Sequence, residues 1–317
     1  MATHHIAPSR ETLHGTFSRD HAPILTIAPG DTVVYTTLDA SWTLAPGATP
    51  DVHGPIFTPR DPERDGGHAL CGPVFIEGAH PGGTLAIEIG ELVPGSYGWN
   101  FGSTNANGIN ERLGVSGESL RLAWDIDVEA GTATNQFGQS VTLSPFFGVM
   151  GMPIDEDGFL PTAPPRVTGG NIDCKELVAG TTLFLPIAVE GGLFSTGDAH
   201  ARQGDGEVST TAIECPMASG SLTFSLRDDL SLTTPIAWTP DAWLTFGFHE
   251  DLDEATLIAL NAMLDLMDRE FGIERRQALA LASVVVDLRV TQIVNGVRGV
   301  HAVLRHVDVA GLIRADD

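Results

Sequence analysis

The sequence is poor in cysteine and in basic residues, and it has no long apolar run. Its cysteines, Cys71, Cys174 and Cys215, are an odd number without CxxC spacing, which argues against a disulfide framework and a cysteine-rich zinc site. Seventeen basic residues stand against 41 acidic ones, and the formal charge of −24 disfavours binding to nucleic acid or to an anionic membrane. No run of about 18 apolar residues could span a bilayer. Because the first residues also lack the segments of a secretory signal, we expect a cytoplasmic protein.

Several catalytic motifs are missing as well. The sequence contains no G-x-S-x-G elbow, no H-E-x-x-H, no P-loop and no G-x-G-x-x-G between a strand and a helix. Cys174 stands beside charged residues in the triplet CKE, but three consecutive side chains cannot all face one substrate. Carboxylates and imidazoles are therefore the main candidates for chemistry, and the Cys174 thiol stays as an alternative.

Glycine and proline, by contrast, are abundant, and their spread predicts short strands instead of long helices over most of the chain. The 36 glycines and 20 prolines punctuate β-branched runs, as in residues 24–38, 72–95 and 180–200. Strands of this length separated by turns are typical of a sandwich or a barrel. We predict a mainly β fold, with a multi-stranded sandwich- or barrel-like body at residues 1–240.

The pattern changes near Pro240, and residues 241–317 are predicted to form a smaller α+β unit packed on the body. Apolar residues recur at helical spacing over 251–271 after an acidic start. A second, more apolar helix is predicted at 273–288, and two strands about an Asn-Gly corner at 289–304.

The stretch 197–207, GDAHARQGDGE, concentrates side chains that could bind a metal or move a proton. Asp198 and His200 are two residues apart, and so are Asp205 and Glu207. In an extended backbone each pair would point to one face. Gly-Asp pairs are also common turn formers, so a purely structural turn is the alternative.

A second segment of the same kind lies upstream. Asn171 and Asp173 are also two residues apart, in GGNID, where the two glycines allow a close approach of the backbone. Asp173 together with Asp198 and His200 could supply a mixed oxygen and imidazole site for a divalent ion. The spacing does not fit a calcium-binding EF-hand loop.

The ordered set of motifs resembles the acetamidase/formamidase family over about residues 14 to 305. The motifs that carry the resemblance are 72–82 (GPVFIEGAHPG), 145–153 (PFFGVMGMP), 169–177 (GGNIDCKEL), 197–207 and 290–301 (VTQIVNGVRGVH). The resemblance implies a largely β enzyme, with a metal at its site, that hydrolyses a short aliphatic amide to a carboxylate and ammonia. It also favours a homodimer, for which the apolar run LASVVVDL could supply a surface.

Within that framework we predict Asp173, Asp198 and His200 to bind a divalent metal. Zinc is the first expectation, with manganese and calcium as alternatives, because carboxylates and imidazoles together suit the transition metals and carboxylates alone suit calcium. Such an ion polarises a carbonyl group and makes water more acidic, which an enzyme without a nucleophile motif needs.

We predict Glu77, Asp205 and Glu207 to transfer protons, and His14 and Asn171 to bind substrate. Glu77 or Glu207 would accept a proton from water, and Asp205 or Glu207 would return it to the leaving ammonia. Glu77 ends an apolar run, where a carboxylate is either desolvated and useful or simply solvated.

Two alternatives stay open at this point. A non-catalytic β-sandwich that binds a metal or a sugar would use the same acidic loop without a proton-transfer residue. A thiol amidase would instead depend on Cys174 and would be indifferent to chelators. The turn-rich stretches 46–67 and 151–170 are candidates for the walls or lid of a site in either case.

Overall fold

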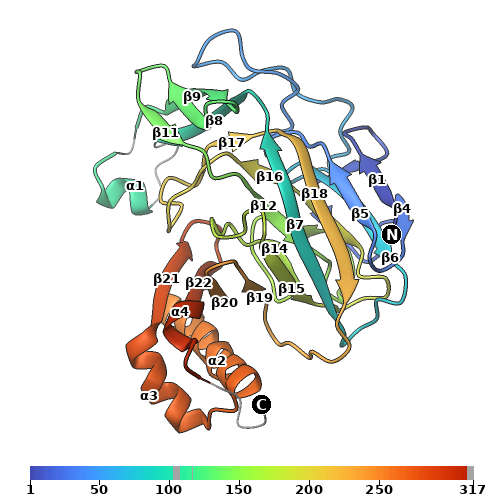
Figure 1. Cartoon of the computed structure of the whole chain (residues 1–317). Helices are drawn as coiled ribbons and strands as arrows, with labels where there is room; N and C mark the ends of the chain where they lie inside the picture. The colour runs from blue at the N-terminus through green and yellow to red at the C-terminus, as the bar shows by residue number, and fades with distance from the viewer. Residues whose placement is uncertain (103–107, 116, 313–317) are drawn as a thin grey trace.

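The computed structural model describes residues 1–102, 108–115 and 117–312, and two large β-sheets are the main architectural elements of that part (Figure 1). The first sheet has nine strands in the spatial order β1 (Thr3–Ile6), β5 (Thr32–Tyr35), β18 (Met217–Leu226), β7 (Thr84–Pro94), β15 (Thr182–Pro186), β19 (Ile236–Trp238), β20 (Ala242–His249), β22 (Arg298–Arg305) and β21 (Val286–Gln292). Its strand pairs are antiparallel except β1 with β5. The predicted mainly β class is confirmed.

The second sheet has eleven strands and carries most of the candidate site. Eight of them follow the order β11 (Ser140–Thr142), β10 (Thr132–Asn135), β9 (Leu120–Asp127), β8 (Tyr97–Gly102), β17 (Glu214–Cys215), β16 (Phe194–His200), β12 (Phe146–Gly151) and β14 (Gly169–Asn171). The other three are β6 (Leu70–Ile76), which pairs with β16, and its partners β2 (Leu13–His14) and β4 (Leu25–Ile27). A separate two-stranded sheet joins β3 (Thr16–Phe17) to β13 (Leu160–Pro161).

The two large sheets pack face to face, as expected for a sandwich. Aromatic side chains from both sheets meet between them: the rings of Tyr35 and Phe147 lie 6.4 Å apart, and those of Phe194 and Phe224 lie 5.0 Å apart. All four belong to one cluster of buried apolar residues. Burial of this apolar surface supplies most of the driving force that holds the sheets together.

The helices lie mainly in the C-terminal part. They are α1 (Gly108–Arg112), α2 (Leu252–Phe271), α3 (Arg275–Val285) and α4 (His306–Val309). The Asp251 side chain caps α2 by accepting hydrogen bonds from the backbone N–H groups of Asp253 and Glu254. The prediction of a helix at 251–271 is confirmed. None of the described helices is long and apolar enough to cross a membrane.

The second predicted helix, at 273–288, extends three residues too far. Residues 286–288 already belong to β21, and α3 passes directly into this strand. No glycine or proline marks the change, and a run of three valines, which favours strand, lies across it. The two strands predicted about the Asn-Gly corner are confirmed as β21 and β22.

The first sheet continues through residue 240, because β19 and β20 pair with each other on either side of it. Figure 1 shows α2, α3, β21 and β22 gathered at the lower left, apart from β7 and β18. The division into a body at 1–240 and a C-terminal unit at 241–317 stays a prediction.

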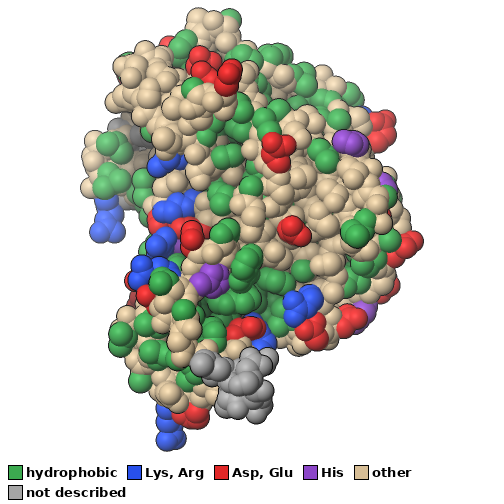
Figure 2. All heavy atoms as spheres, viewed as in Figure 1, with side chains coloured by type: hydrophobic (Ala, Val, Ile, Leu, Met, Phe, Trp, Pro, Cys, Tyr) green, Lys and Arg blue, Asp and Glu red, His purple; other side chains and the backbone are tan. Residues whose placement is uncertain are grey.

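The acidic side chains on the face shown in Figure 2 are not gathered in one patch. Figure 2 shows acidic side chains scattered over one face, whereas most of the basic side chains visible there lie near its left edge. This distribution agrees with a solvated acidic shell.

Helix α2 packs closely on β20 at Gly247, and this contact generates a stability prediction. A Cβ atom on Gly247 would lie 1.9 Å from the backbone oxygen of Ala255 and 2.6 Å from the nitrogen of Ala259. We expect Gly247→Ala to lower the free energy of unfolding by about 1 to 3 kcal/mol, because backbone atoms must move to admit the methyl group. The shift of the urea midpoint measures this.

Gly102→Ala is the matched control, since among the described residues a Cβ there would meet no atom nearer than 4.0 Å. We expect it to change the free energy of unfolding by less than about 0.5 kcal/mol. Equal midpoints for the two variants would contradict the close packing of α2 on β20.

Candidate active site

Four side chains on neighbouring strands of the second sheet form a row across it. Phe146 in β12 stands opposite His200 in β16, His200 opposite Glu214 in β17, and Glu214 opposite Trp99 in β8. Residues directly opposite one another in antiparallel strands point to the same face. The imidazole of His200 therefore lies between the carboxylate of Glu214 and the ring of Phe146, whose centroid is 5.0 Å away.

Four buried carboxylates surround this imidazole. The Nε2 atom of His200 is 3.4 Å from Oδ1 of Asp198 and 3.2 Å from Oε2 of Glu214. Two groups, one formed by Asp198, His200 and Glu214 and the other by Asp173, His200 and Glu207, each bring three ligand-type atoms within 4.8 Å of one another. The exposed fractions of all five residues are between 1% and 6%. We call these five residues the His200 cluster.

The backbone around the His200 cluster is strained. Asp173, Asp198 and Glu207 have φ angles of 53°, 53° and 44°, a region that side chains other than glycine rarely adopt. Gly148 faces the cluster, and a Cβ atom there would lie 2.7 Å from Oδ1 of Asp173 and 2.8 Å from Cε1 of His200. Strain of this kind persists where the surrounding structure fixes side chains for function.

Two amide side chains orient members of the cluster. Gln203 donates from Nε2 to the backbone oxygen of Asp173 at 2.7 Å, so its Oε1 faces Nδ1 of His200 at 2.9 Å. Because that oxygen can only accept, Nδ1 carries the proton and Nε2 of a neutral His200 keeps its lone pair. Asn295, from the turn between β21 and β22, donates from Nδ2 to Oδ2 of Asp173 at 2.7 Å.

Burial shifts the pKa values of three of the carboxylates upward. It raises the pKa of Asp173 well above the ordinary value, and the charge of Glu207 adds to this effect. It also raises the pKa of Glu207 to about 8 and that of Glu214 to about 8. Glu207 and Glu214 are therefore partly protonated near neutral pH unless a cation offsets their charge.

Asp198 and His200 behave as a charged pair. Burial opposes ionisation of Asp198, but the nearby His68 and His200 outweigh it and hold the pKa of Asp198 below its ordinary value. Burial also lowers the pKa of His200, but the carboxylates of Glu214 and Asp198 outweigh that effect and raise it well above the ordinary range. The pocket between these groups thus favours a positive charge.

The donor atoms of the cluster fit a divalent cation. Buried polar atoms without a hydrogen-bond partner are rare in proteins. Of the ten found among the residues that the structure describes, five lie here: Oδ1 of Asn171, Oδ1 of Asp173, Nε2 of His200, Oε2 of Glu207 and Oε2 of Glu214. One imidazole nitrogen among carboxylate oxygens is a ligand set that zinc and manganese accept.

A cavity of about 550 Å³ opens over the cluster. Asn171, Asp198, Glu207 and Glu214 line it, and Trp99 forms an aromatic part of its wall. The two stretches predicted as site walls both contribute, through the following residues: Gly66 and Gly67 from 46–67, and Phe159, Pro161, Thr162 and Ala163 from 151–170. The cluster is thus accessible to a small molecule.

Five of the eight predicted site residues come together here. Asp173, Asp198, His200 and Glu207 belong to the His200 cluster, and Asn171 lines the same cavity. Glu214, Gln203 and Asn295 are not among the predicted site residues. Gln203 and Asn295 stand inside quoted motifs, but Glu214 follows the acidic loop and reaches His200 only because β17 pairs with β16.

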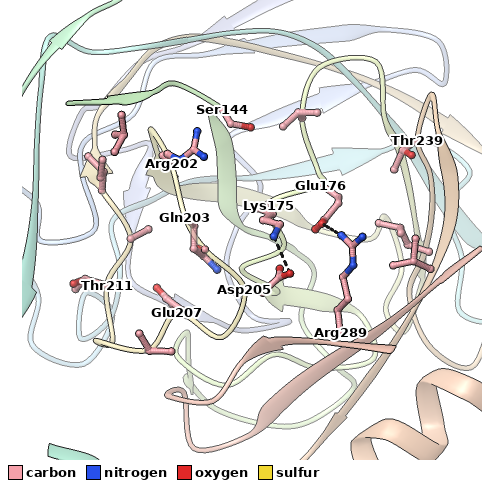
Figure 3. A pocket seen from close by; sticks show the side chains of 18 of the residues that line it. Ser144, Lys175, Glu176, Arg202, Gln203, Asp205, Glu207, Thr211, Thr239 and Arg289 are labelled. Carbon is pink, nitrogen blue, oxygen red and sulfur yellow. Dashed lines mark hydrogen bonds and ion pairs between the residues drawn. The ribbon is translucent and has the colours of Figure 1, made fainter. Parts of the chain in front are cut away.

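The other three predicted site residues lie elsewhere. Glu77 is exposed just beyond the end of β6 and does not line the cavity. Asp205 pairs with Lys175, with 2.7 Å between Oδ2 and Nζ, in a second cavity that Glu207 also lines (Figure 3). The extended backbone assumed for the pair Asp205 and Glu207 is not present, because Glu207 has a φ angle of 44°.

His14 is buried close to the cavity and has structural partners. Its Nδ1–H donates to the backbone oxygen of Thr16 at 2.7 Å, so its Nε2 accepts from the hydroxyl of Ser195 at 2.9 Å. Gly15 and Thr16 line the cavity, and His14 does not. A role in binding substrate therefore stays a prediction.

Fold and site together define a two-sheet β protein with a buried carboxylate and imidazole centre at the base of a cavity. The sequence model of the acetamidase/formamidase family matches residues 2–157 and 153–304. The chain belongs to the acetamidase/formamidase family, as the motifs predict.

The sequence identity to individual relatives is low. The chain is 27% identical to the acetamidase of Mycolicibacterium smegmatis over 199 residues, which cover 45% of this chain and 49% of that protein. It is 24% identical to the formamidase of Methylophilus methylotrophus over 248 residues, which cover 62% of this chain and 60% of that protein. The chain thus spans about half to three fifths of these relatives. The crystal structure of an acetamidase from Bacillus halodurans has the same fold, with a TM-score of 0.82, 24% identity and coverage of 97% of this chain and 99% of that chain.

The buried His14 generates a pH prediction. Burial, with a smaller effect of His21, lowers the pKa of His14 from its ordinary 6.5 to about 3. Between these two pH values the unfolded chain binds a proton at His14 that the folded protein does not. The contribution of His14 to the free energy of unfolding is therefore fully present above pH 6.5 and is lost as the pH falls. From pH 7.5 to 5 we expect the wild type to lose about 2 kcal/mol more than His14→Gln.

Urea unfolding of both proteins at the two pH values measures this difference. For each protein the measured quantity is the change in the free energy of unfolding between the two pH values. A destabilisation that Gln causes equally at both pH values therefore cancels. Parallel losses in the two proteins would show that His14 does not stay neutral in the fold.

Proposed function

We propose that this protein hydrolyses a short aliphatic amide, of the formamide or acetamide type, to a carboxylate and ammonia with the help of a divalent cation. The observation that carries the proposal is the convergence of buried carboxylates on Nε2 of His200 at the base of a cavity. The family membership supports amide hydrolysis as the reaction.

Asp198, His200 and Glu214 are the residues proposed to hold the cation. Their ligand atoms lie closest together, and both acids line the cavity. Glu214 thus replaces Asp173 in the predicted ligand set, because Asp173 does not line the cavity and its Oδ2 already accepts a hydrogen bond from Asn295. A divalent cation supplies Lewis acidity to an amide carbonyl and to water.

Glu207 is the proposed proton carrier. Hydrolysis forms a bond between a water oxygen and the amide carbon and breaks the carbon–nitrogen bond, so a proton must pass from the water to the nitrogen. Oε2 of Glu207 has no partner among the described residues, and Glu207 lines the cavity. Because burial raises its pKa to about 8, Glu207 can accept and return a proton near neutral pH. Glu77 and Asp205 have no part in this proposal.

Asn171 is proposed to recognise the amide group itself. Its Nδ2 donates to the backbone oxygen of Ala163 at 3.1 Å, which turns Oδ1 into a buried acceptor without a partner. An amide substrate offers N–H donors to such an oxygen, whereas an ester does not. The predicted substrate-binding role of Asn171 is therefore kept.

The thiol alternative has little support. Cys174 is fully buried, and its thiol donates to Oε2 of Glu176 at 3.2 Å. Burial, with the charge of Glu176, raises the pKa of Cys174 well above the ordinary range. A nucleophilic cysteine needs the opposite, an accessible sulfur with a lowered pKa.

Three expectations about the whole protein stay predictions: zinc as the cation, a cytoplasmic location and a homodimer. The dimer has one structural argument in its favour. Strand β21 lies at the edge of the first sheet and exposes Leu288, and the neighbouring α3 exposes Leu279 and Val284. Exposed apolar residues beside an unpaired strand edge are typical of an interface.

Ammonia release from formamide, acetamide and propionamide tests the proposal. We expect release from the purified protein to disappear on exhaustive chelation and to return when zinc or manganese is added, because the Lewis acid is removed and restored. Metal content measured on the same samples links activity to occupancy.

Release that chelation leaves intact would contradict the cation and return attention to Cys174. If the protein binds metal but releases ammonia neither from these three amides nor from larger aryl amides, the non-catalytic binding module is favoured.

Asp198→Asn tests the ligand assignment. We expect kcat to fall by at least about a hundredfold, the scale of a lost charge-stabilising group at an active site, and metal content to fall with it. Asp228→Asn, at a side chain that is 74% exposed, is the matched control and should retain both. A metal-replete and active Asp198→Asn protein, folded by circular dichroism, would overturn the assignment.

A further inference from the structure

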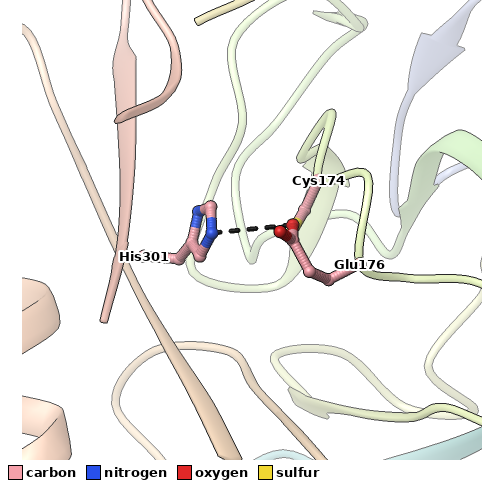
Figure 4. A group of neighbouring side chains, drawn as sticks. All are labelled: Cys174, Glu176 and His301. Atoms are coloured by element: carbon pink, nitrogen blue, oxygen red, sulfur yellow. Dashed lines mark hydrogen bonds and ion pairs between the residues drawn. The ribbon is translucent and has the colours of Figure 1, made fainter. Parts of the chain in front are cut away.

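A second group of metal-ligand side chains lies beside the His200 cluster and takes no part in the proposed reaction. Sγ of Cys174, Oε2 of Glu176 and Nε2 of His301 all lie within 4.8 Å of one another. Figure 4 shows the His301 ring, on β22, pointing toward the other two side chains. Cys174 and His301 are fully buried, and the side chain of Glu176 is 19% exposed.

The imidazole of His301 lacks a partner on the side that faces this group. Its Nδ1 is 2.8 Å from Oγ1 of Thr291, whereas Nε2 has no hydrogen-bond partner among the described residues. The nearest carboxylate oxygen, Oε2 of Glu176, is 3.6 Å away, which is too long for a hydrogen bond. A buried nitrogen of this kind indicates a group bound between the three side chains.

The ligand-type residues also have outer partners that hold them in place. Thr291 fixes the ring of His301 through Nδ1, and Nη1 of Arg289 binds Oε1 of Glu176 at 2.9 Å. Each of these contacts occupies an atom outside the group. Nε2 of His301 stays without a hydrogen-bond partner among the described residues, and Oε2 of Glu176 accepts within the group, from the Cys174 thiol. Metal sites in proteins commonly have such a second layer, which orients the ligands.

We propose that Cys174, Glu176 and His301 bind a second divalent transition metal of the zinc class. A thiolate, an imidazole nitrogen and a carboxylate oxygen form a ligand set that zinc accepts and that calcium and magnesium do not. Binding releases the proton of the Cys174 thiol to solvent, and the thiolate and the carboxylate then balance the two charges of the metal. This site does not depend on the protein being an amidase.

The position of the second site gives it a structural role. Cys174 follows Asp173 directly, and His301 lies on the strand after the turn that carries Asn295. A metal at this point ties together the two segments that place Asp173 in the His200 cluster. Three protein ligands leave a coordination position for water from the second cavity, of about 810 Å³, which Glu176 lines (Figure 3).

Cobalt substitution of the full-length protein tests the site. We expect metal-stripped protein to bind two Co²⁺ ions per chain and to develop the near-ultraviolet charge-transfer absorption of a thiolate bound to cobalt. Cys174→Ser should lose this absorption and bind one ion. Cys71→Ser, which removes another fully buried thiol, should keep both signals.

The outcome does not depend on activity. Absence of the thiolate absorption in the wild type, or its persistence in Cys174→Ser, would overturn the proposal. If Cys174→Ser fails to fold, His301→Gln should show the same loss of one ion, and retention of both ions would count against the site. Asp198→Asn should keep the thiolate absorption, which separates this site from the His200 cluster.

Discussion

The main physical constraint on this structure is the burial of four carboxylates around one imidazole, that of His200. Taking a carboxylate out of water is costly unless a counter-charge or hydrogen bonds replace the solvent. Only Asp198 is held in its charged form by its neighbours, whereas burial raises the pKa values of Asp173, Glu207 and Glu214. The fold therefore keeps an unfavourable arrangement that a cation would relieve, and the loops, strained residues and close contacts around it serve to maintain that arrangement.

Both parts of the chain contribute to this arrangement. The second sheet supplies His200 and Glu214 through neighbouring strands, and the turn between β21 and β22 supplies Asn295 to Asp173. The same C-terminal hairpin holds the acidic loop by backbone hydrogen bonds, from Gly206 N to Thr291 O at 3.0 Å and from Ile293 N to Gly206 O at 3.2 Å. The helices α2 and α3 thus support the site indirectly, by packing on the hairpin that reaches it.

The sequence predicts the fold class and the location of the site better than its geometry. Turn residues between β-branched runs are local signals, and so is the acidic loop, which is why the strands and Asp198 with His200 were found. The pairing of Glu214 with His200 is not local, because it depends on which strands become neighbours. The two-residue spacing also assumes an extended backbone, and this fails at Glu207, where φ is 44°. Exposure of Glu77 could not be predicted either, because a strand end can be buried or solvated.

His200 has a single available nitrogen, which explains why the four carboxylates of the His200 cluster need not have the same role. Gln203 occupies Nδ1, so Nε2 can serve one cation and not two. A cation bound by Asp198, His200 and Glu214 would leave Asp173 and Glu207 as the other two carboxylates of the cluster, and the charge of Glu207 is near enough to raise the pKa of Asp173. Asp173 is fixed by Asn295, whereas Glu207 borders both cavities. This difference supports the proposal that Glu207, and not Asp173, exchanges a proton with the substrate.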